Sequence, residues 1–123
     1  MKTFDLDKEI KKLKLNYSNS DITAKNFPAK PREGVFEIVN FEKGVESDEA
    51  VKLLKEKGLE PATASELVVW GNENPDKWED KLVVALGDSF GGSYGLVHVA
   101  YLYGDASRRE LSLGVRQNRW NRN

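Results

Sequence analysis

The last third of the chain alternates between apolar and small or polar residues with a period of two. Residues 96–103 and 111–115 follow this pattern, and residues 82–86 form a continuous apolar run. Successive side chains of a β-strand point to opposite faces of a sheet, so these runs are typical of strands. Segments rich in Gly, Asp and Ser connect them at residues 87–95 and 104–108. The pattern therefore predicts an antiparallel meander of at least three strands.

The beginning of the chain shows a helical period instead. Residues 4–15 place Leu6, Ile10 and Leu13 on one stripe, with most of the lysines elsewhere, which predicts a short amphipathic helix. Such a helix could also lie on a membrane surface. The stripe is narrow, however, and the acidic residues beside it would oppose anionic lipid. We therefore expect this helix to pack on the domain.

The next segments are short and differ in character. Residues 16–20 form a polar break, residues 21–27 are expected to make one helical turn, and residues 28–34 have the composition of a loop. Residues 35–41 are rich in β-branched and aromatic residues and are apolar on both faces. This last pattern predicts a strand inside a sheet.

A second helix is predicted to begin at Ser47, a residue type that caps helix N-termini. Its buried stripe consists of Ala50, Val51 and Leu54. The acidic residues of its first turn suit the positive end of the helix dipole. Gly58 can adopt the left-handed conformation that ends a helix, so we expect the helix to stop there.

The corner after this helix carries the strongest local signal in the sequence. Pro61 biases the residue before it away from the helical region. Thr63 and Glu66 have the three-residue spacing of a capping box, in which each side chain accepts a backbone N–H at the start of a helix. A third helix is therefore predicted over residues 64–70, with Gly71 and Pro75 closing it.

The order of these elements defines the fold class. A helix, a strand, two helices and then a run of strands is the order of an α+β domain. At 123 residues the chain is expected to form one domain around one core. We divide it into an N-terminal extension over residues 1–34, a core over 35–115 and a basic tail over 116–123.

Composition excludes several classes of chemistry. The chain has no Cys and one His, which excludes disulfides, thiolate metal sites, cysteine nucleophiles and two-histidine sites. The first residues lack the apolar region of a signal peptide, and no apolar run approaches the ~20 residues of a membrane span. We expect no cofactor, no metal and no membrane contact, and a cytoplasmic location.

The corner and the meander together carry a resemblance. A Gly-x-x-Pro-x-Thr-x-x-Glu-Leu pattern runs from Gly58 to Leu67, and Val84-Ala85-Leu86-Gly87 follows it. This combination resembles a group of short uncharacterised bacterial proteins. More distantly it is similar to the C-type-lectin-like fold, as in formylglycine-generating-enzyme relatives and the variable proteins of diversity-generating retroelements, where a Gly-x-Arg-x-Pro-Thr-x-x-Glu-Trp corner joins two helices.

The resemblance implies a fold and not an activity. It implies two helices joined by a capped corner and packed on a mainly antiparallel sheet, to which this chain adds an N-terminal helix. The enzyme chemistry of those relatives relies on cysteines, and this chain has none. Glu60 stands where the relatives usually have Arg, and the chain ends soon after Trp120, where they continue into a closing strand. Either that strand is missing or the sheet closes differently.

The motifs that could carry chemistry are weak. Gly91 to Gly95 matches the Gly-x-Ser-x-Gly nucleophile elbow, with Ser93 as the nucleophile. An elbow needs a helix after it, whereas a strand is predicted here, and His98 is expected to be a hydrogen-bonded residue of that strand. The glycines also lack the Lys-Ser/Thr of a phosphate-binding loop. We interpret this segment as a glycine-rich connection and predict that the protein is not an enzyme.

Two aspartates suggest a calcium site as an alternative. Asp88 and Asp105 lie at predicted strand ends, and if their loops shared one edge of the sheet they could bind a calcium ion. Turn formation explains both residues as well, and we predict no metal site.

Binding through loops at a sheet edge is the function that we predict. The partner would be a protein or a small ligand, because binding residues concentrate on loops held by rigid scaffolds. The candidate ligand-binding residues are Phe90, Tyr94, Arg116, Arg119 and Trp120. The alternative is association with nucleic acid through the tail, because residues 106–123 hold five Arg and one acidic residue. The preceding residues hold 14 basic and 19 acidic side chains, which disfavours this alternative.

Overall fold

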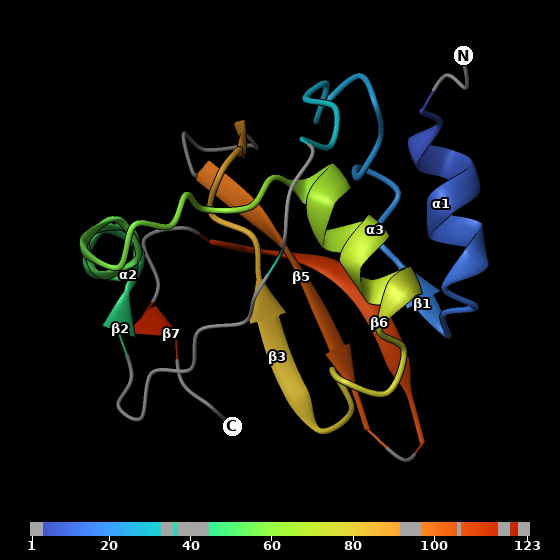
Figure 1. Cartoon of the computed structure of the whole chain (residues 1–123). Helices are drawn as coiled ribbons and strands as arrows, with labels where there is room; N and C mark the ends of the chain where they lie inside the picture. The colour runs from blue at the N-terminus through green and yellow to red at the C-terminus, as the bar shows by residue number, and fades with distance from the viewer. Residues whose placement is uncertain are drawn as a thin grey trace.

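The fold is α+β and was analysed in a computed structural model that describes residues 4–32, 36, 45–91, 97–105, 107–115 and 119–120 (Figure 1). Within these ranges there are three helices: α1 (Leu6–Lys12), α2 (Ser47–Glu56) and α3 (Ala64–Glu73). The strands are β1 (Tyr17–Ser18), β2 (Val45–Glu46), β3 (Lys81–Val84), β4 (Phe90–Gly91), β5 (Val97–Gly104), β6 (Arg109–Val115) and β7 (Arg119–Trp120).

The predicted meander is confirmed, and β5 is its central strand. β6 pairs with β5 antiparallel along one side. On the other side β3 and β4 both pair with β5, β3 through Leu82 opposite Tyr103 and β4 through Phe90 opposite His98. β3 and β4 therefore line the same side of β5, and residues 85–89 connect them.

A parallel edge strand was missed in the sequence. β1 lies in the segment that we interpreted as a polar break, and it pairs parallel with β6. The Asn16 and Asn19 amides donate to the carbonyls of Arg109 and Leu111, both at 2.9 Å. Both residues of β1 are exposed, so no apolar alternation marks the strand. Backbone pairing with a neighbour distant in sequence defines it instead.

The helices α1 and α3 cover one face of the main sheet. Figure 1 shows α3 in front of the strands and α1 on the outer side of α3. The predicted N-terminal helix is confirmed, with Leu6 and Leu13 almost fully buried and Asp5 capping it. The expected turn over residues 21–27 is present, because the Phe27 amide donates to the Thr23 carbonyl at 2.8 Å. The core consists mainly of Leu6, Leu13, Ile22, Phe27, Leu67, Val68, Trp70, Trp78, Ala100, Leu102 and Leu111.

The predicted end of α3 at Gly71 was wrong. The helix continues to Glu73, and Gly71 is buried within it. A Cβ atom at Gly71 would come within 2.7 Å of Leu102 Cδ1, and the Gly71 carbonyl accepts a hydrogen bond from the Trp78 indole at 3.2 Å. Close packing therefore explains this glycine better than a helix stop does.

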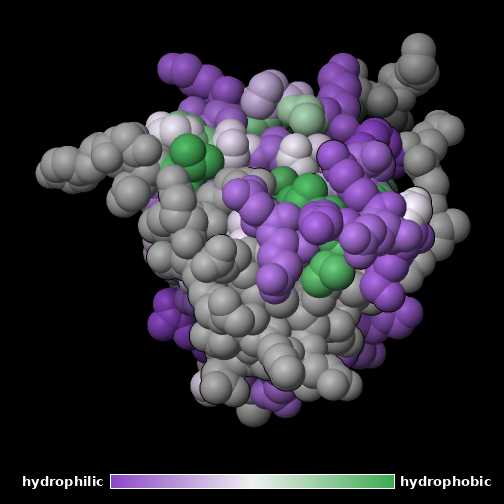
Figure 2. Space-filling view, turned by 90° about the vertical axis from the view of Figure 1, so that its left-hand side faces the viewer, coloured by the Kyte–Doolittle hydropathy of each residue, from purple (hydrophilic) through white to green (hydrophobic). Residues whose placement is uncertain are grey.

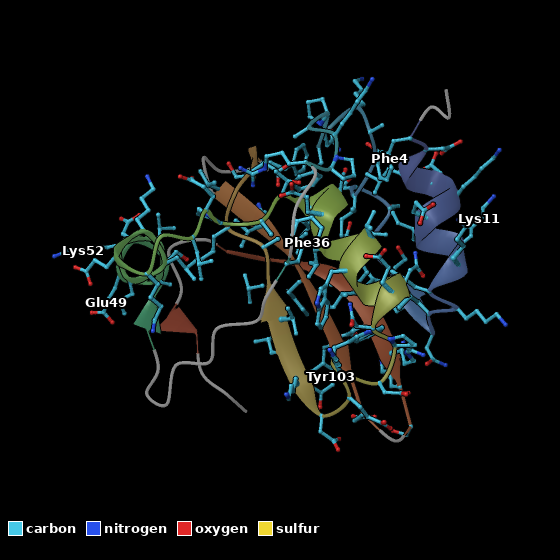
Figure 3. All side chains as sticks on the ribbon, viewed as in Figure 1. Phe4, Lys11, Phe36, Glu49, Lys52 and Tyr103 are labelled. Atoms are coloured by element: carbon cyan, nitrogen blue, oxygen red, sulfur yellow. The ribbon has the colours of Figure 1, made fainter. Side chains whose placement is uncertain are left out.

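The predicted strand over residues 35–41 lies outside the described residues, except for Phe36. Phe36 is partly buried against the core, and Figure 3 shows it beside α3. β2 and β7 form a separate two-stranded antiparallel sheet, with Val45 opposite Trp120 and Glu46 opposite Arg119.

Helix α2 lies at the opposite end of the molecule from α1 (Figure 1). It begins at Ser47 as predicted; Ala50 is buried, whereas Glu49 and Lys52 are exposed and point outward (Figure 3). Among the residues that Figure 2 colours on this side of the molecule, most are hydrophilic, with small apolar areas between them. Among the described residues, no helix has the length and apolar character needed to cross a membrane.

Candidate functional site

Both halves of the predicted corner are present. Gly58 has a φ of 78°, and the Gly58 and Leu59 amides donate to the carbonyls of Lys55 at 3.0 Å and Leu54 at 2.9 Å. These are the two hydrogen bonds of a Schellman motif. The Thr63 hydroxyl accepts from the Glu66 amide at 3.3 Å, and the Glu66 carboxylate accepts from the Thr63 amide at 2.8 Å. The capping box is confirmed.

An arginine from the N-terminal extension reaches the same corner. The Arg32 side chain donates to both oxygens of Glu66, from Nε to Oε2 at 2.9 Å and from Nη2 to Oε1 at 2.8 Å. The Arg32 amide also donates to Oε2, and Nη2 donates to the Pro61 carbonyl, each at 2.8 Å. In this chain Arg32, 34 residues before Glu66, brings an arginine to the corner.

This pair keeps a buried carboxylate charged. The Glu66 side chain is fully buried, whereas the Arg32 side chain is about half exposed, at 51%. Burial opposes ionisation of Glu66, but the hydrogen bonds from Arg32 and from the Thr63 amide outweigh it and lower the pKa of Glu66 to about 2. The Glu66 carboxylate therefore stays ionised at pH values well above 2.

The connection between β3 and β4 is fastened onto this corner. The Gly87 amide donates to the Ala62 carbonyl at 2.7 Å, and Asp88 Oδ1 accepts from the Ala64 amide at 2.7 Å. A Cβ atom at Gly87 would lie 2.5 Å from the Pro61 carbonyl oxygen, so the two backbones approach too closely for a side chain. Asp88 thus satisfies a free N–H at the start of α3 from another part of the chain.

The two oxygens of Asp88 have different environments. Oδ1 caps α3, whereas Oδ2 is buried and has no hydrogen-bond partner. Burial raises the pKa of Asp88; the Ala64 hydrogen bond lowers it, and the nearby Glu66 carboxylate raises it again. The net direction is upward, opposite to that of Glu66. The pKa values of two neighbouring carboxyl groups are therefore shifted in opposite directions.

The predicted ligand-binding residues divide between several places. Phe90 is in β4, two residues after Asp88, and it is partly buried against Phe27 with ring centroids 6.2 Å apart. Arg119 and Trp120 form β7, which pairs with β2 in the second sheet rather than with β4. Tyr94 and Arg116 lie outside the described residues. Backbone pairing therefore does not join Phe90 to the tail residues.

His98 differs from its expected role. It lies in β5 opposite Phe90 and shares the helix-covered face with Ala100 and Leu102. Its Nδ1 atom is buried and has no hydrogen-bond partner, so the expected hydrogen-bonded ring is wrong for this atom. Ser93, the serine of the elbow-like motif, lies outside the described residues.

The alternative of a calcium site requires Asp88 and Asp105 to lie at one edge of the sheet, and they lie at opposite ends of β5. Asp105 follows the end of β5, where it accepts a hydrogen bond from the Tyr103 hydroxyl at 3.2 Å, whereas Asp88 precedes β4, which pairs with the start of β5. Asp105 closes a turn by accepting from Ser107 and from the Arg108 amide, and these bonds lower its pKa. In the described part of the chain, no group of three or more His, Cys, Asp or Glu residues could hold a metal ion.

Comparison of the chain with protein-family models, with curated proteins and with solved structures gave no significant match. The candidate site is therefore defined by the geometry of this structure alone. It comprises the loop from Leu86 to Ser89, the corner to which this loop is fastened, and Phe90 immediately after it. Sequence reasoning missed Arg32 and the capping role of Asp88, and no local pattern around either residue indicates them.

Proposed function

We propose that the chain is a non-enzymatic binding module that recognises a protein or a small ligand through the loops at the β4 end of the main sheet. The observation that carries the proposal is the attachment of the Gly87–Asp88 loop to the corner before α3. This attachment gives the connection that leads into β4 a rigid base. Rigid bases under variable loops are a common design for binding surfaces.

A C-type-lectin-like arrangement is part of the proposal. β2 immediately precedes α2 and pairs antiparallel with β7, the last described strand. The resemblance predicts a closing strand after the meander, and β7 is in the right place in the chain for that role. The corner between α2 and α3 supports the same arrangement through its capping box and Schellman motif.

The strand context argues against a serine hydrolase. The Gly91–Gly95 segment follows β4 and precedes β5, whereas a nucleophile elbow leads from a strand into a helix. His98 lies on the face of β5 that α3 and α1 cover, not in a loop. This arrangement favours a connection between strands over a catalytic turn.

Nucleic-acid binding through the arginine-rich end is the second candidate, and internal contacts weaken it. Arg108 pairs with Glu110 at 3.1 Å, and the Arg109 guanidinium lies 4.2 Å from the Trp78 ring centroid. Two of the five arginines of residues 106–123 thus use their side chains in contacts within the domain.

A printed array of purified proteins, peptides and glycans would test the proposal. The wild-type chain should bind a restricted set of spots, and Ser89→Arg, which places a bulky charged side chain at an exposed position of the candidate loop, should lose them. Tyr17→Arg is the matched control, because Tyr17 is exposed on β1, at the other edge of the sheet. Binding that is lost with Tyr17→Arg and kept with Ser89→Arg would contradict the proposed surface.

A further inference from the structure

The carboxyl groups of Asp88 and Glu66 both accept hydrogen bonds at the start of α3, but their oxygens differ in the number of donors that they have. Both oxygens of Glu66 accept hydrogen bonds, from Arg32 and from Thr63. Asp88 uses only Oδ1, which accepts from the Ala64 amide, and its buried Oδ2 has no donor. A buried acceptor without a donor is costly when the group is charged.

Protonation would remove this cost without breaking the cap. A proton on Oδ2 neutralises the buried group and leaves Oδ1 free to accept from the Ala64 amide. The charged groups that act on Asp88 are Glu66 from α3, which disfavours its ionisation, and Arg32 from the segment before the core, which favours it. Glu60 acts on Arg32 from the corner itself. The largest effect is burial, which favours the neutral acid.

We propose that the loop from Leu86 to Ser89 is a proton-dependent latch, which is held tightly on the corner when Asp88 is protonated and more loosely when Asp88 is ionised. The Gly87 amide and the Asp88 carboxyl are its two fastening points. At Gly87 the loop backbone approaches the backbone of Pro61 and Ala62 so closely that there is no room for a side chain. Release of the latch would therefore break these two specific contacts and would not loosen the loop in general.

The direction of the pH dependence follows from the two carboxyl groups. The pKa of Asp88 is raised in the fastened state, so fastening is strongest below the ordinary carboxyl pKa of 3.8 and weakens as pH rises through the raised value. The pKa of Glu66 is lowered to about 2, so its ion pair with Arg32 is fully present above 4.5 and is lost only toward pH 2. The latch consequently loosens as pH rises from 3.8, and above 4.5 the ion pair of the corner stays complete.

The loop from Leu86 to Ser89 lies directly before β4 in the chain, at the end of the sheet where we propose that the partner binds. Ser89 connects Asp88 to Phe90, so release of the loop would alter the position of β4. A pH-dependent affinity would follow, and that consequence rests on the proposed function. The latch itself concerns only the free protein and can be tested without any ligand.

Amide hydrogen exchange of the Gly87 N–H, followed by NMR from pH 4 to pH 8, would test the latch. After correction for the intrinsic exchange rate, Gly87 protection should fall as pH rises, by about tenfold for each unit by which fastening raises the pKa of Asp88. Asp88→Asn keeps an oxygen for the Ala64 amide and cannot ionise, so its Gly87 protection should not change with pH. Asp105→Asn is the matched control and should retain the wild-type profile.

Two further readouts keep the test independent of global stability. The Leu102 amide, in the buried centre of β5, reports global opening and should show no matching pH step. The carboxyl carbon of Asp88 should titrate above that of Asp105 in the wild-type chain. The inference would be overturned by Gly87 protection that does not change with pH, by the same pH dependence in Asp88→Asn, or by an Asp88 carboxyl that titrates below that of Asp105.

Discussion

Arg32 and Glu66 form a two-pronged ion pair across 34 residues of sequence, with donor–acceptor distances of 2.9 Å and 2.8 Å. The carboxylate belongs to the capping box of α3, and the guanidinium belongs to the segment before the core. One side chain therefore stabilises the start of a helix and holds the N-terminal extension in place. The Gly87–Asp88 loop is fastened at the same corner.

Removal of either partner of this pair should be strongly destabilising. Glu66→Ala removes the capping box and leaves Arg32 unpaired, and Arg32→Ala leaves a buried carboxylate without its cation. We expect each to lower the free energy of unfolding by about 3 kcal/mol, measured by urea denaturation. Arg108→Ala is the control, because its partner Glu110 keeps 19% of its side chain exposed, whereas Glu66 is fully buried, so this pair should contribute less than about 1 kcal/mol. Similar losses in all three variants would contradict this assignment.

The same carboxylate should make stability depend on acid. The pKa of Glu66 is about 2 in the folded protein, below its ordinary value of 4.5. Its contribution to stability is therefore complete above pH 4.5 and is lost as pH falls toward 2. Glu66→Gln should flatten the stability profile over this interval, as followed by denaturation at each pH. An unchanged profile would show that another group causes the acid sensitivity.

Gly87 should tolerate substitution poorly, and Gly91 should tolerate it well. A Cβ atom at Gly87 would lie 2.5 Å from the Pro61 carbonyl oxygen and 2.6 Å from that of Ala62, whereas nothing lies within 4 Å of one at Gly91. Gly87→Ala should cost about 1–3 kcal/mol, and Gly91→Ala should change stability by less than about 0.5 kcal/mol. Thermal unfolding of the two variants measures the difference. Equal melting temperatures for Gly87→Ala and Gly91→Ala would show that the close backbone contact does not limit substitution at Gly87.

Ser93 should not behave as a nucleophile. The segment that contains Ser93 connects two strands, whereas a nucleophile elbow leads from a strand into a helix, so we expect a fluorophosphonate probe to leave the wild-type chain unlabelled. Mass spectrometry of the intact protein would measure the labelling, with Ser89→Ala as a control for loop serines in general. Stoichiometric labelling that Ser93→Ala abolishes would contradict the non-enzymatic proposal.

Local signals predicted the corner correctly, because each of its contacts lies within a few residues. The spacing of Thr63 and Glu66 and the position of Gly58 are sufficient to define the capping box and the Schellman motif. The strands β3, β5 and β6 were equally clear, because apolar residues run continuously through β3 and recur with a period of two in β5 and β6.

Long-range contacts could not be predicted in the same way. Asp88 lies 24 residues after the amide that it caps, and it resembles any other turn aspartate in sequence. β1 is exposed and polar, so only its pairing with β6 reveals it. Gly71 has the position of a helix stop, but packing against Leu102 and Trp78 explains it. Each of these features depends on the tertiary fold.

The most direct test of the central claim is a footprint of a bound ligand on the protein. The ligand would be the strongest wild-type spot of the array, and hydrogen exchange with mass spectrometry would map its protection. We expect protection to concentrate between Leu86 and His98, with no change at the β5–β6 turn around Asp105 or along α1. Protection confined to α1 or to the turn around Asp105, with none between Leu86 and His98, would contradict the account.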